Sequence, residues 1–121
     1  NINKRQTGTE YETLAVAYLE KQDVRVVERN FRNRFGEIDI IGYDGEYLVF
    51  VEVKLRKSAE FAEAREFVDY HKQSRLHATA EMYLSRNPTK LQPRFDVIEI
   101  YAPDGTETIK PEIYHIEDAF Q

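Results

Sequence analysis

The stretch Phe35–Lys57, FGEIDIIGYDGEYLVFVEVKLRK, decides the fold of this 121-residue chain. It contains two apolar, β-branched runs on either side of Asp44-Gly45, a dipeptide that favours a tight turn. The pattern therefore predicts an antiparallel hairpin of two strands, at 37–43 and 47–55. Charged side chains occur in both runs, although such strands are usually buried, so this hairpin is the first place to look for a function.

The second strand of this hairpin changes character along its length. Residues 49, 51, 53 and 55 point to one face and residues 48, 50, 52 and 54 to the other, because side chains alternate in a strand. Both faces begin apolar, but one becomes charged at Glu52 and Lys54. The strand is therefore expected to leave the core and enter a cleft, the usual place for ligands in open α/β sheets.

The flanking segments predict the rest of the fold. A capping box at Thr9 and Glu12 and apolar residues at helical spacing predict a helix over 9–22. A short strand is expected at 24–31, a helix from about 60 to 86, and two further strands at 95–101 and 106–114, joined by a turn at Asp104-Gly105. On the second helix, one face is formed by Lys72, Leu76, Ala80 and Tyr83.

The expected fold class is α/β, with the element order αβββαββ in a single domain over 1–121. The strand–helix–strand crossover requires strands 47–55 and 95–101 to be parallel, whereas the hairpins are antiparallel. The prediction is a mixed β-sheet flanked by helices.

Charge and composition restrict the function classes. The net charge is −5, and the whole excess lies in 99–121, because the first 98 residues carry sixteen basic and sixteen acidic side chains. A locally basic face for nucleic acid therefore remains available. The chain has no Cys, which excludes thiolate chemistry and disulfides, and it has no run long enough to span a membrane. The amino terminus lacks a signal-peptide pattern, so we expect a cytoplasmic protein with no membrane partner.

The carboxylates of the hairpin suggest a metal site. Alternation places Glu37, Asp39 and Ile41 on one face of the first strand, and that face can meet Glu52 and Lys54 of the second. Carboxylates this close repel unless protons or a cation separate them. Oxygen ligands without His or Cys favour Mg²⁺ or Mn²⁺. This arrangement suits metal-assisted hydrolysis of a phosphodiester.

Asp39, twelve intervening residues and then Glu52-Val53-Lys54 resemble the D…ExK core of the PD-(D/E)XK nuclease superfamily, whose restriction-endonuclease-like αβββαβ core is similar to the order above. The closer resemblance is to the bacterial YraN-like family of small predicted endonucleases, related to archaeal Holliday junction resolvases. It is carried by GTEYETLAVAYLEKQ, RNFRNRFGEIDIIGYDGEYLVFVEVKLR, KQSRLHATAEMYL and PRFDVIEI. The chain departs from these relatives at Lys57–Asp69, where they usually have a Gly-containing loop.

The resemblance implies roles for individual residues. Asp39, Glu52 and the backbone carbonyl of Val53 are the implied ligands of Mg²⁺ or Mn²⁺, and Lys54 is the implied partner of the attacking water. Glu12 matches a first-helix glutamate that resolvase-like members place near the metal. Supporting roles are implied for Glu37, Lys72 and Asp96. The DNA-binding candidates are Arg29, Arg32, Arg34, Arg56, Lys72 and Arg94.

The implied function is metal-dependent endonucleolytic cleavage of DNA, with branched or other non-standard structures as candidate substrates and a homodimer as the expected state. Structural explanations stay open for single residues: Glu12 completes a capping box, Glu52 and Lys54 form a surface pair, Asp39 ties down the hairpin, and Lys72 extends its stem over apolar surface. The alternative functions are a catalytically idle nucleic-acid-binding or adaptor protein with the same fold, and a structural domain that binds a partner.

Overall fold

The fold of the protein is a five-stranded mixed sheet with two α-helices. The structure is a computed structural model that describes residues 4–56 and 69–121. Its elements are α1 (Lys4–Lys21), β1 (Arg25–Asn33), β2 (Gly36–Asp44), β3 (Tyr47–Arg56), α2 (Tyr70–Arg86), β4 (Gln92–Tyr101), the 3₁₀ turn η2 (Gly105–Glu107) and β5 (Glu112–Phe120). The predicted αβββαββ order is confirmed.

The sheet has the order β1-β2-β3-β4-β5, so each strand pairs with its neighbours in sequence. β3 and β4 are parallel, as the crossover through α2 requires, and the other three pairs are antiparallel. The β2–β3 turn is the two-residue loop Gly45-Glu46, in which Gly45 has φ 58°. This left-handed conformation suits glycine, and it explains the strong turn signal in the sequence.

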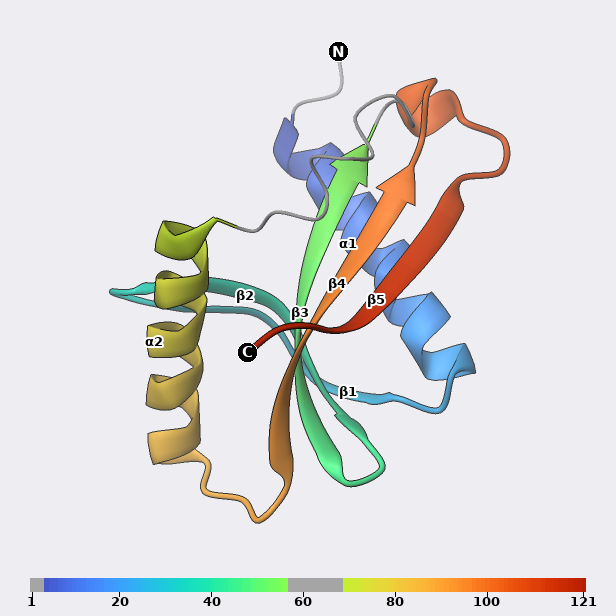
Figure 1. Cartoon of the computed structure of the whole chain (residues 1–121). Coiled ribbons are helices and arrows are strands. Elements are labelled where there is room, and N and C mark those ends of the chain that lie inside the picture. The colour runs from blue at the N-terminus through green and yellow to red at the C-terminus, as the bar shows by residue number, and fades with distance from the viewer. Residues whose placement is uncertain (1–3, 57–68) are drawn as a thin grey trace.

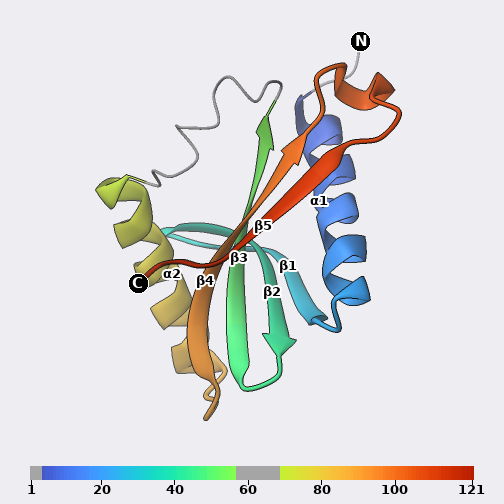
Figure 2. The same ribbon diagram turned by 45° about the vertical axis from the view of Figure 1, so that its right-hand side comes forward.

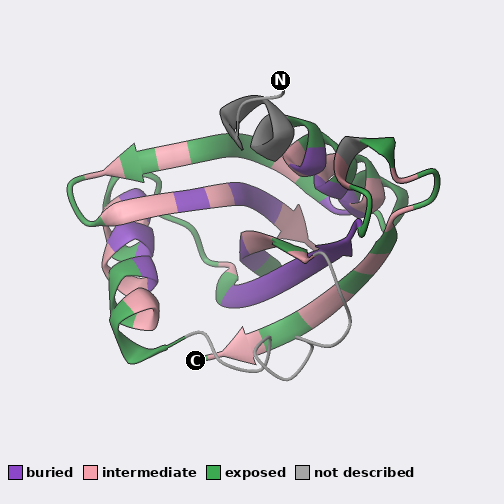
Figure 3. Ribbon diagram, turned by 90° about the horizontal axis from the view of Figure 1, so that it is seen from above, coloured by how far each residue is buried: buried purple, intermediate pink, exposed green. Residues whose placement is uncertain are grey.

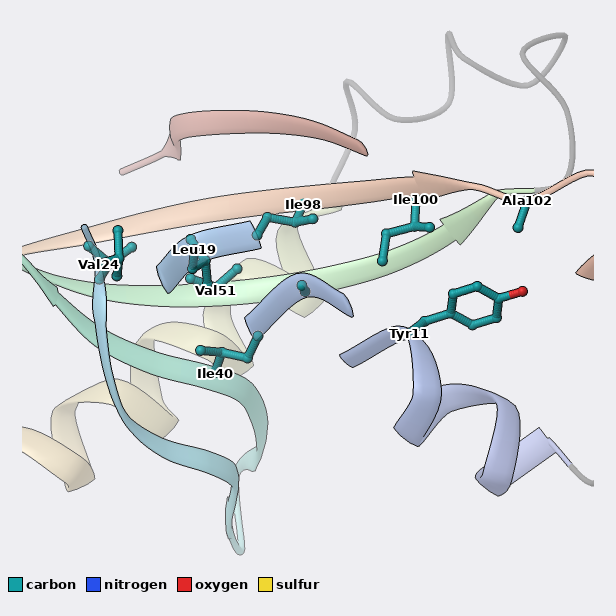
Figure 4. Packing of buried hydrophobic residues seen from close by; sticks show 10 residues of the cluster. Tyr11, Leu19, Val24, Ile40, Val51, Ile98, Ile100 and Ala102 are labelled. Atoms are coloured by element: carbon teal, nitrogen blue, oxygen red, sulfur yellow. The ribbon is translucent and has the colours of Figure 1, made fainter. Parts of the chain in front are cut away.

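The two helices cover different parts of the sheet, α2 on one side and α1 on the other (Figures 1 and 2). Ala15 and Leu19 of α1 pack on Ile40, Val51 and Ile98, and Figure 4 shows this cluster from close by. On the α2 side, a second cluster is formed by Ile38, Ile41, Leu48, Phe50, Leu76, Ala80, Tyr83, Phe95 and Val97. The predicted inner face of the second helix is therefore confirmed for its three apolar members.

Burial is greatest in the central strands. From Arg94 to Tyr101 every residue of β4 is buried, whereas the edge strands β1 and β5 are mostly exposed or half-buried (Figure 3). In β3, Val49 and Val51 face α1, whereas Leu48 and Phe50 face α2. Beyond Val51 the strand is only half-buried at Glu52 and Lys54. The expected passage of this strand out of the core is confirmed.

The β1–β2 hairpin bends away from β3 and lies beside α2 (Figure 1). The β2–β3 ladder stops at Ile40–Val51, whereas the β1–β2 ladder continues to Asn33–Gly36. The Asn33 side chain donates to the Thr79 carbonyl oxygen over 3.4 Å. A Cβ at Gly36 would stand 3.2 Å from Thr79 Oγ1, so glycine permits this close approach.

This bend corrects the expected face of β2. Strict alternation would place Ile38 and Ile40 together, but Ile38 and Ile41 pack toward α2 and Ile40 packs toward α1. The alternation therefore breaks at Asp39, and Glu37, Asp39 and Ile41 do not form one regular face. The reason is that β2 leaves β3 at this position and follows only β1.

Both helices begin at other residues than the sequence predicts. α1 begins at Lys4, so Thr9 lies inside the helix and the predicted capping box is wrong. α2 begins at Tyr70, capped by the Asp69 side chain, which accepts from the Lys72 amide over 2.9 Å. The part of the expected helix that falls on 57–68 lies outside the described residues.

The last strand is displaced as well. The sequence predicts it at 106–114, but β5 spans Glu112–Phe120 and η2 occupies part of the expected strand. Pro111 has no amide hydrogen to donate to a ladder, so pairing begins only after it. In the described part of the chain, neither α1 nor α2 has the length and apolar character needed to cross a membrane.

Candidate functional site

A cleft of about 410 Å³ opens between the β1–β2 hairpin, the end of β3 and the first turns of α2. It contains both carboxylates that the sequence singled out as metal ligands, Asp39 and Glu52. Its full lining is Asn33, Arg34, Phe35, Gly36, Glu37, Asp39, Glu52, Lys72, Arg75 and Leu76. The bend of the hairpin toward α2 forms this cleft.

The Asp39 side chain takes the place of a backbone hydrogen bond between β2 and β3. Where the β2–β3 ladder ends, the Asp39 carboxylate accepts a hydrogen bond from the Val53 amide over 2.8 Å. The N–H and C=O of one strand residue point the same way, so the Val53 carbonyl also faces the side of Asp39. A backbone oxygen and a carboxylate are thereby presented to the same space.

The pKa of Asp39 is raised from 3.8 to about 7. Burial is the largest cause, and the negative charge of Glu52 is the next, while the Val53 hydrogen bond opposes both. Glu12 and Glu37 raise the pKa further. Four carboxylates from α1, β2 and β3 therefore act on one another around this position, which is the electrostatic situation expected where a cation can bind.

Glu12 belongs to this group despite its distance in sequence. Burial raises its pKa, and the charges of Glu37 and Glu52 add to the effect. A hydrogen bond from the Asn30 side chain and the charge of Arg29 act in the opposite direction. Thr9 is not the N-cap of α1, so a capping box does not explain Glu12. What the structure shows instead is that Glu12 interacts with the other acidic residues of the cleft.

Glu52 has a lysine partner from α2. Lys72 Nζ lies 2.8 Å from Glu52 Oε1, and the Glu52 side chain is 12% exposed against 37% for Lys72. A Glu52–Lys54 surface ion pair was the structural explanation of Glu52 that the sequence left open. The structure instead shows an ion pair between Glu52 and Lys72. The pair joins the sheet to the first turn of α2 across the cleft.

Lys54 lies on the same face of β3 as Glu52. Burial lowers the pKa of Lys54, and the positive charges of Lys72 and Arg56 lower it further, partly opposed by Glu52 and Glu99. Its ammonium therefore gives up a proton more readily than that of an ordinary lysine, which is useful beside a reacting water.

Glu99 is a site neighbour that the sequence analysis missed. It lies opposite Lys54 in the parallel β3–β4 ladder, its side chain is fully buried, and its Oε2 is 3.4 Å from Arg56 Nε. In the sequence, Glu99 stands out only as one of the acidic residues of the segment 99–121. The available signal was a charge inside the apolar run of β4, the same signal that identified Glu52 in β3.

The predicted DNA-binding arginines are in different surroundings. Arg34 lines the cleft, with its guanidinium 4.9 Å from the centre of the Phe35 ring. Arg32 pairs with Glu37 over 3.3 Å. Arg29 is exposed and donates to Thr13 over 3.2 Å. Arg56 is held by Glu99, whereas Arg29, Arg32 and Arg34 are exposed on the β1–β2 hairpin.

Arg94 and Asp96 are not brought to the cleft. Asp96 alternates with Phe95 and Val97, which face α2, so it points to the α1 side of the sheet. Two nitrogens of Arg94 donate to Asp96 over 2.8 and 2.9 Å. Arg94 also bridges to Asp44 over 2.8 Å and is 9% exposed.

The same Asp96 carboxylate binds the last strand. His115 Nε2 lies 2.7 Å from Asp96 Oδ2, and the Asp118 amide donates to Oδ1 over 3.0 Å. Hydrogen bonds to Asp96, which offset its burial, hold its pKa low. This buried network fastens β5 to β4, and it holds Arg94 and Asp96 outside the cleft that contains Asp39 and Glu52.

The donors around Asp39 suit a hard divalent cation, because they are carboxylate and carbonyl oxygens. Within residues 4–56 and 69–121, no three His, Cys, Asp or Glu side chains are close enough to form a ready-made metal centre. Asp39, Glu52 and the Val53 carbonyl supply two carboxylates and one backbone oxygen, and the chemistry of this donor set fits Mg²⁺ or Mn²⁺.

Comparison with known proteins gives a consistent family signal. Residues 11–100 match the model of "Uncharacterised protein family UPF0102". A UPF0102 protein of Caldanaerobacter subterraneus subsp. tengcongensis is 40% identical over 120 residues, covering 98% of both chains. A UPF0102 protein of Vibrio parahaemolyticus is 46% identical over 102 residues, covering 83% of this chain and 84% of the relative. The matched segment contains every residue of the cleft.

Proposed function

This chain belongs to the UPF0102 family, and we propose that it is a divalent-metal-dependent DNA endonuclease of the PD-(D/E)XK type. The observation that carries the proposal is Asp39, whose carboxylate lies at the break of the β2–β3 ladder under the influence of three other carboxylates. Without a cation, the repulsion among these carboxylates and the burial of Asp39 cost electrostatic free energy. The cost is understandable in a cleft at the end of a strand, because such clefts commonly bind ligands.

Asp39, Glu52 and the Val53 carbonyl would hold Mg²⁺ or Mn²⁺ in this proposal. When bound, the ion supplies Lewis-acid activation of the scissile phosphate and of a water molecule. Lys54 Nζ would orient that water and, as the neutral amine that its lowered pKa favours, accept the proton that the water loses on attack. Hydrolysis leaves a 5′-phosphate and a 3′-hydroxyl.

Glu12 and Glu37 complete the acidic environment of the cleft, while Arg34 at its rim would meet a phosphate of the DNA backbone. Branched or other non-standard DNA is the candidate substrate, and a homodimer is the expected acting form because two strands would then be cut symmetrically.

Cleavage assays test this proposal directly. The protein is incubated with labelled linear, flapped, forked and four-way DNA in Mn²⁺, in Mg²⁺ and in EDTA. We expect cleavage only with a divalent cation and its loss in Asp39→Ala and Glu52→Ala. Glu46→Gln, which removes an exposed carboxylate at the β2–β3 turn, is the matched control. Cleavage that persists in both cleft variants would refute the assignment.

A catalytically idle DNA-binding or adaptor protein is the second candidate. It is favoured by the Lys72 ammonium, which lies 2.8 Å from Glu52 Oε1, where a cation would have to bind. This function predicts DNA binding without any cleavage, and DNA affinity that is the same in EDTA and in Mn²⁺. The same substrates therefore discriminate the two candidates when binding is measured beside cleavage.

A further inference from the structure

The Glu52–Lys72 ion pair occupies the place where a cation would have to act. Lys72 Nζ is 2.8 Å from Glu52 Oε1, and both side chains line the cleft together with Asp39. An ammonium in contact with a ligand oxygen repels an incoming divalent cation. Two positive charges at about 4 Å interact strongly in surroundings of intermediate dielectric.

The two partners differ in their freedom to move. The Glu52 side chain is 12% exposed and comes from a strand paired to β4 at this position, whereas the Lys72 side chain is 37% exposed and comes from the first turn of α2. Lys72 can therefore swing into solvent on its long stem while Glu52 remains in place. A second positive side chain, Lys54, follows on the same face of β3, so Glu52 does not lose all compensation when Lys72 leaves.

We propose that Lys72 is a built-in counter-ion that holds the place of the divalent cation at Glu52 and transfers to a backbone phosphate of DNA when the cation enters. The inference rests on the proposed function and adds a regulatory step to the same site. The metal-free cleft is neutralised by Lys72, and the released ammonium becomes one of the groups that bind the substrate. Arg34, on the opposite rim of the cleft, offers the phosphate a second positive contact.

This exchange couples the two ligands thermodynamically. DNA that binds Lys72 leaves Glu52 open to the cation, so DNA should raise the affinity for the cation, and the cation should raise the affinity for DNA by the same factor. The cleft would then become loaded chiefly when a substrate is present. A site that takes up its cation only together with the proper substrate cleaves other DNA less, which is a useful property for a nuclease.

The test compares Lys72→Met with the parent, because methionine keeps an unbranched apolar stem and removes the charge. Mn²⁺ binding without DNA is measured from the electron paramagnetic resonance signal of free Mn²⁺. We expect Lys72→Met to bind Mn²⁺ about fivefold more tightly, in line with the small stabilisation of a partly exposed ion pair. Arg75→Met is the matched control, since it removes a positive charge from the same cleft and the same helix.

DNA coupling is measured by fluorescence anisotropy of a labelled duplex in EDTA and in Ca²⁺, a cation that takes the same oxygen ligands. The parent should bind DNA more tightly in Ca²⁺, and Lys72→Met should lose this increase, while Lys72→Arg should retain it. Melting curves verify that each variant is folded.

The outcomes separate this inference from the proposed function. Mn²⁺ binding that is equal in the parent and in Lys72→Met, or tightened to the same degree in Arg75→Met, overturns the counter-ion role alone. Mn²⁺ binding that is absent from the parent and from Lys72→Met overturns both proposals. Mn²⁺ binding that appears only in Lys72→Met supports the counter-ion role in its strongest form.

Discussion

Replacing Asp39 with Asn tests the electrostatic origin of the cleft. Asparagine keeps an oxygen that can accept the 2.8 Å hydrogen bond from the Val53 amide, but it removes the charge that burial and Glu52 disfavour. We therefore expect Asp39→Asn to be more stable than the parent at alkaline pH in EDTA, and to lose this advantage as the pH falls.

The sign and size follow from the raised pKa. The pKa of Asp39 is about 7 in the folded chain, against 3.8 for an ordinary aspartate. The folded state therefore holds a proton that the unfolded state has already lost, and the stability this proton contributes disappears as the pH rises through 7. Between pH 5 and pH 8 the linkage relation gives a loss of about 2.5 kcal/mol for the parent and none for Asp39→Asn.

Urea unfolding at pH 5, 6, 7 and 8 in EDTA measures this difference. The free energy of unfolding of Asp39→Asn minus that of the parent should increase with pH, mostly between pH 5 and pH 7. Glu46→Gln, at the exposed turn, should run parallel to the parent, because its carboxylate is not buried. Parallel curves for Asp39→Asn and the parent would refute the proposed strain. Mn²⁺ added at pH 8 should stabilise the parent and leave Asp39→Asn nearly unchanged.

Three further predictions concern the scaffold and the DNA surface. Arg94→Met should lower the free energy of unfolding by ~3–5 kcal/mol, because Asp96 then stays buried without its main counter-charge; a loss below 1 kcal/mol in urea unfolding would contradict the structural role. Gly42→Ala should lower the free energy of unfolding by ~1–3 kcal/mol in the same assay, since the new Cβ would stand 3.0 Å from the Arg25 carbonyl oxygen. An unchanged unfolding midpoint would show that β1 can shift to make room for the methyl group without loss of stability. If the cleft binds DNA, Arg34→Ala should reduce the slope of log affinity against log salt by about one in anisotropy titrations, and an identical slope would remove Arg34 from the interface.

The acidic residues illustrate how far local pattern can identify a site. Asp39 and Glu52 were predicted from charges inside apolar strands, and the structure places both in one cleft. Glu12 was assigned through a family resemblance, with a helix cap as its structural alternative, and the longer α1 removes that alternative. Glu99 carries the same signal as Glu52, a charge within an apolar run. Its burial, however, depends on the neighbouring strands β3 and β5, and the apolar run of β4 does not reveal which strands lie beside it.

Sequence alone determined the elements whose signals are local. The alternation of β3, the turn at Gly45 and the apolar stripe of α2 each depend on residues within a few positions of one another, and all three appear as predicted. The parallel pairing of β3 and β4 also followed, because a crossover through a helix leaves little choice of direction.

Tertiary structure alone decided how these elements meet. The bend of β2 at Asp39, the approach of Gly36 to α2 and the pairing of Glu52 with Lys72 join segments far apart in the chain. Side-chain periodicity specifies which face a residue occupies, but not which distant segment covers that face. For the same reason Arg94, which looks like a DNA contact in sequence, is buried against Asp96, because the packing of β5 closes that side of the sheet.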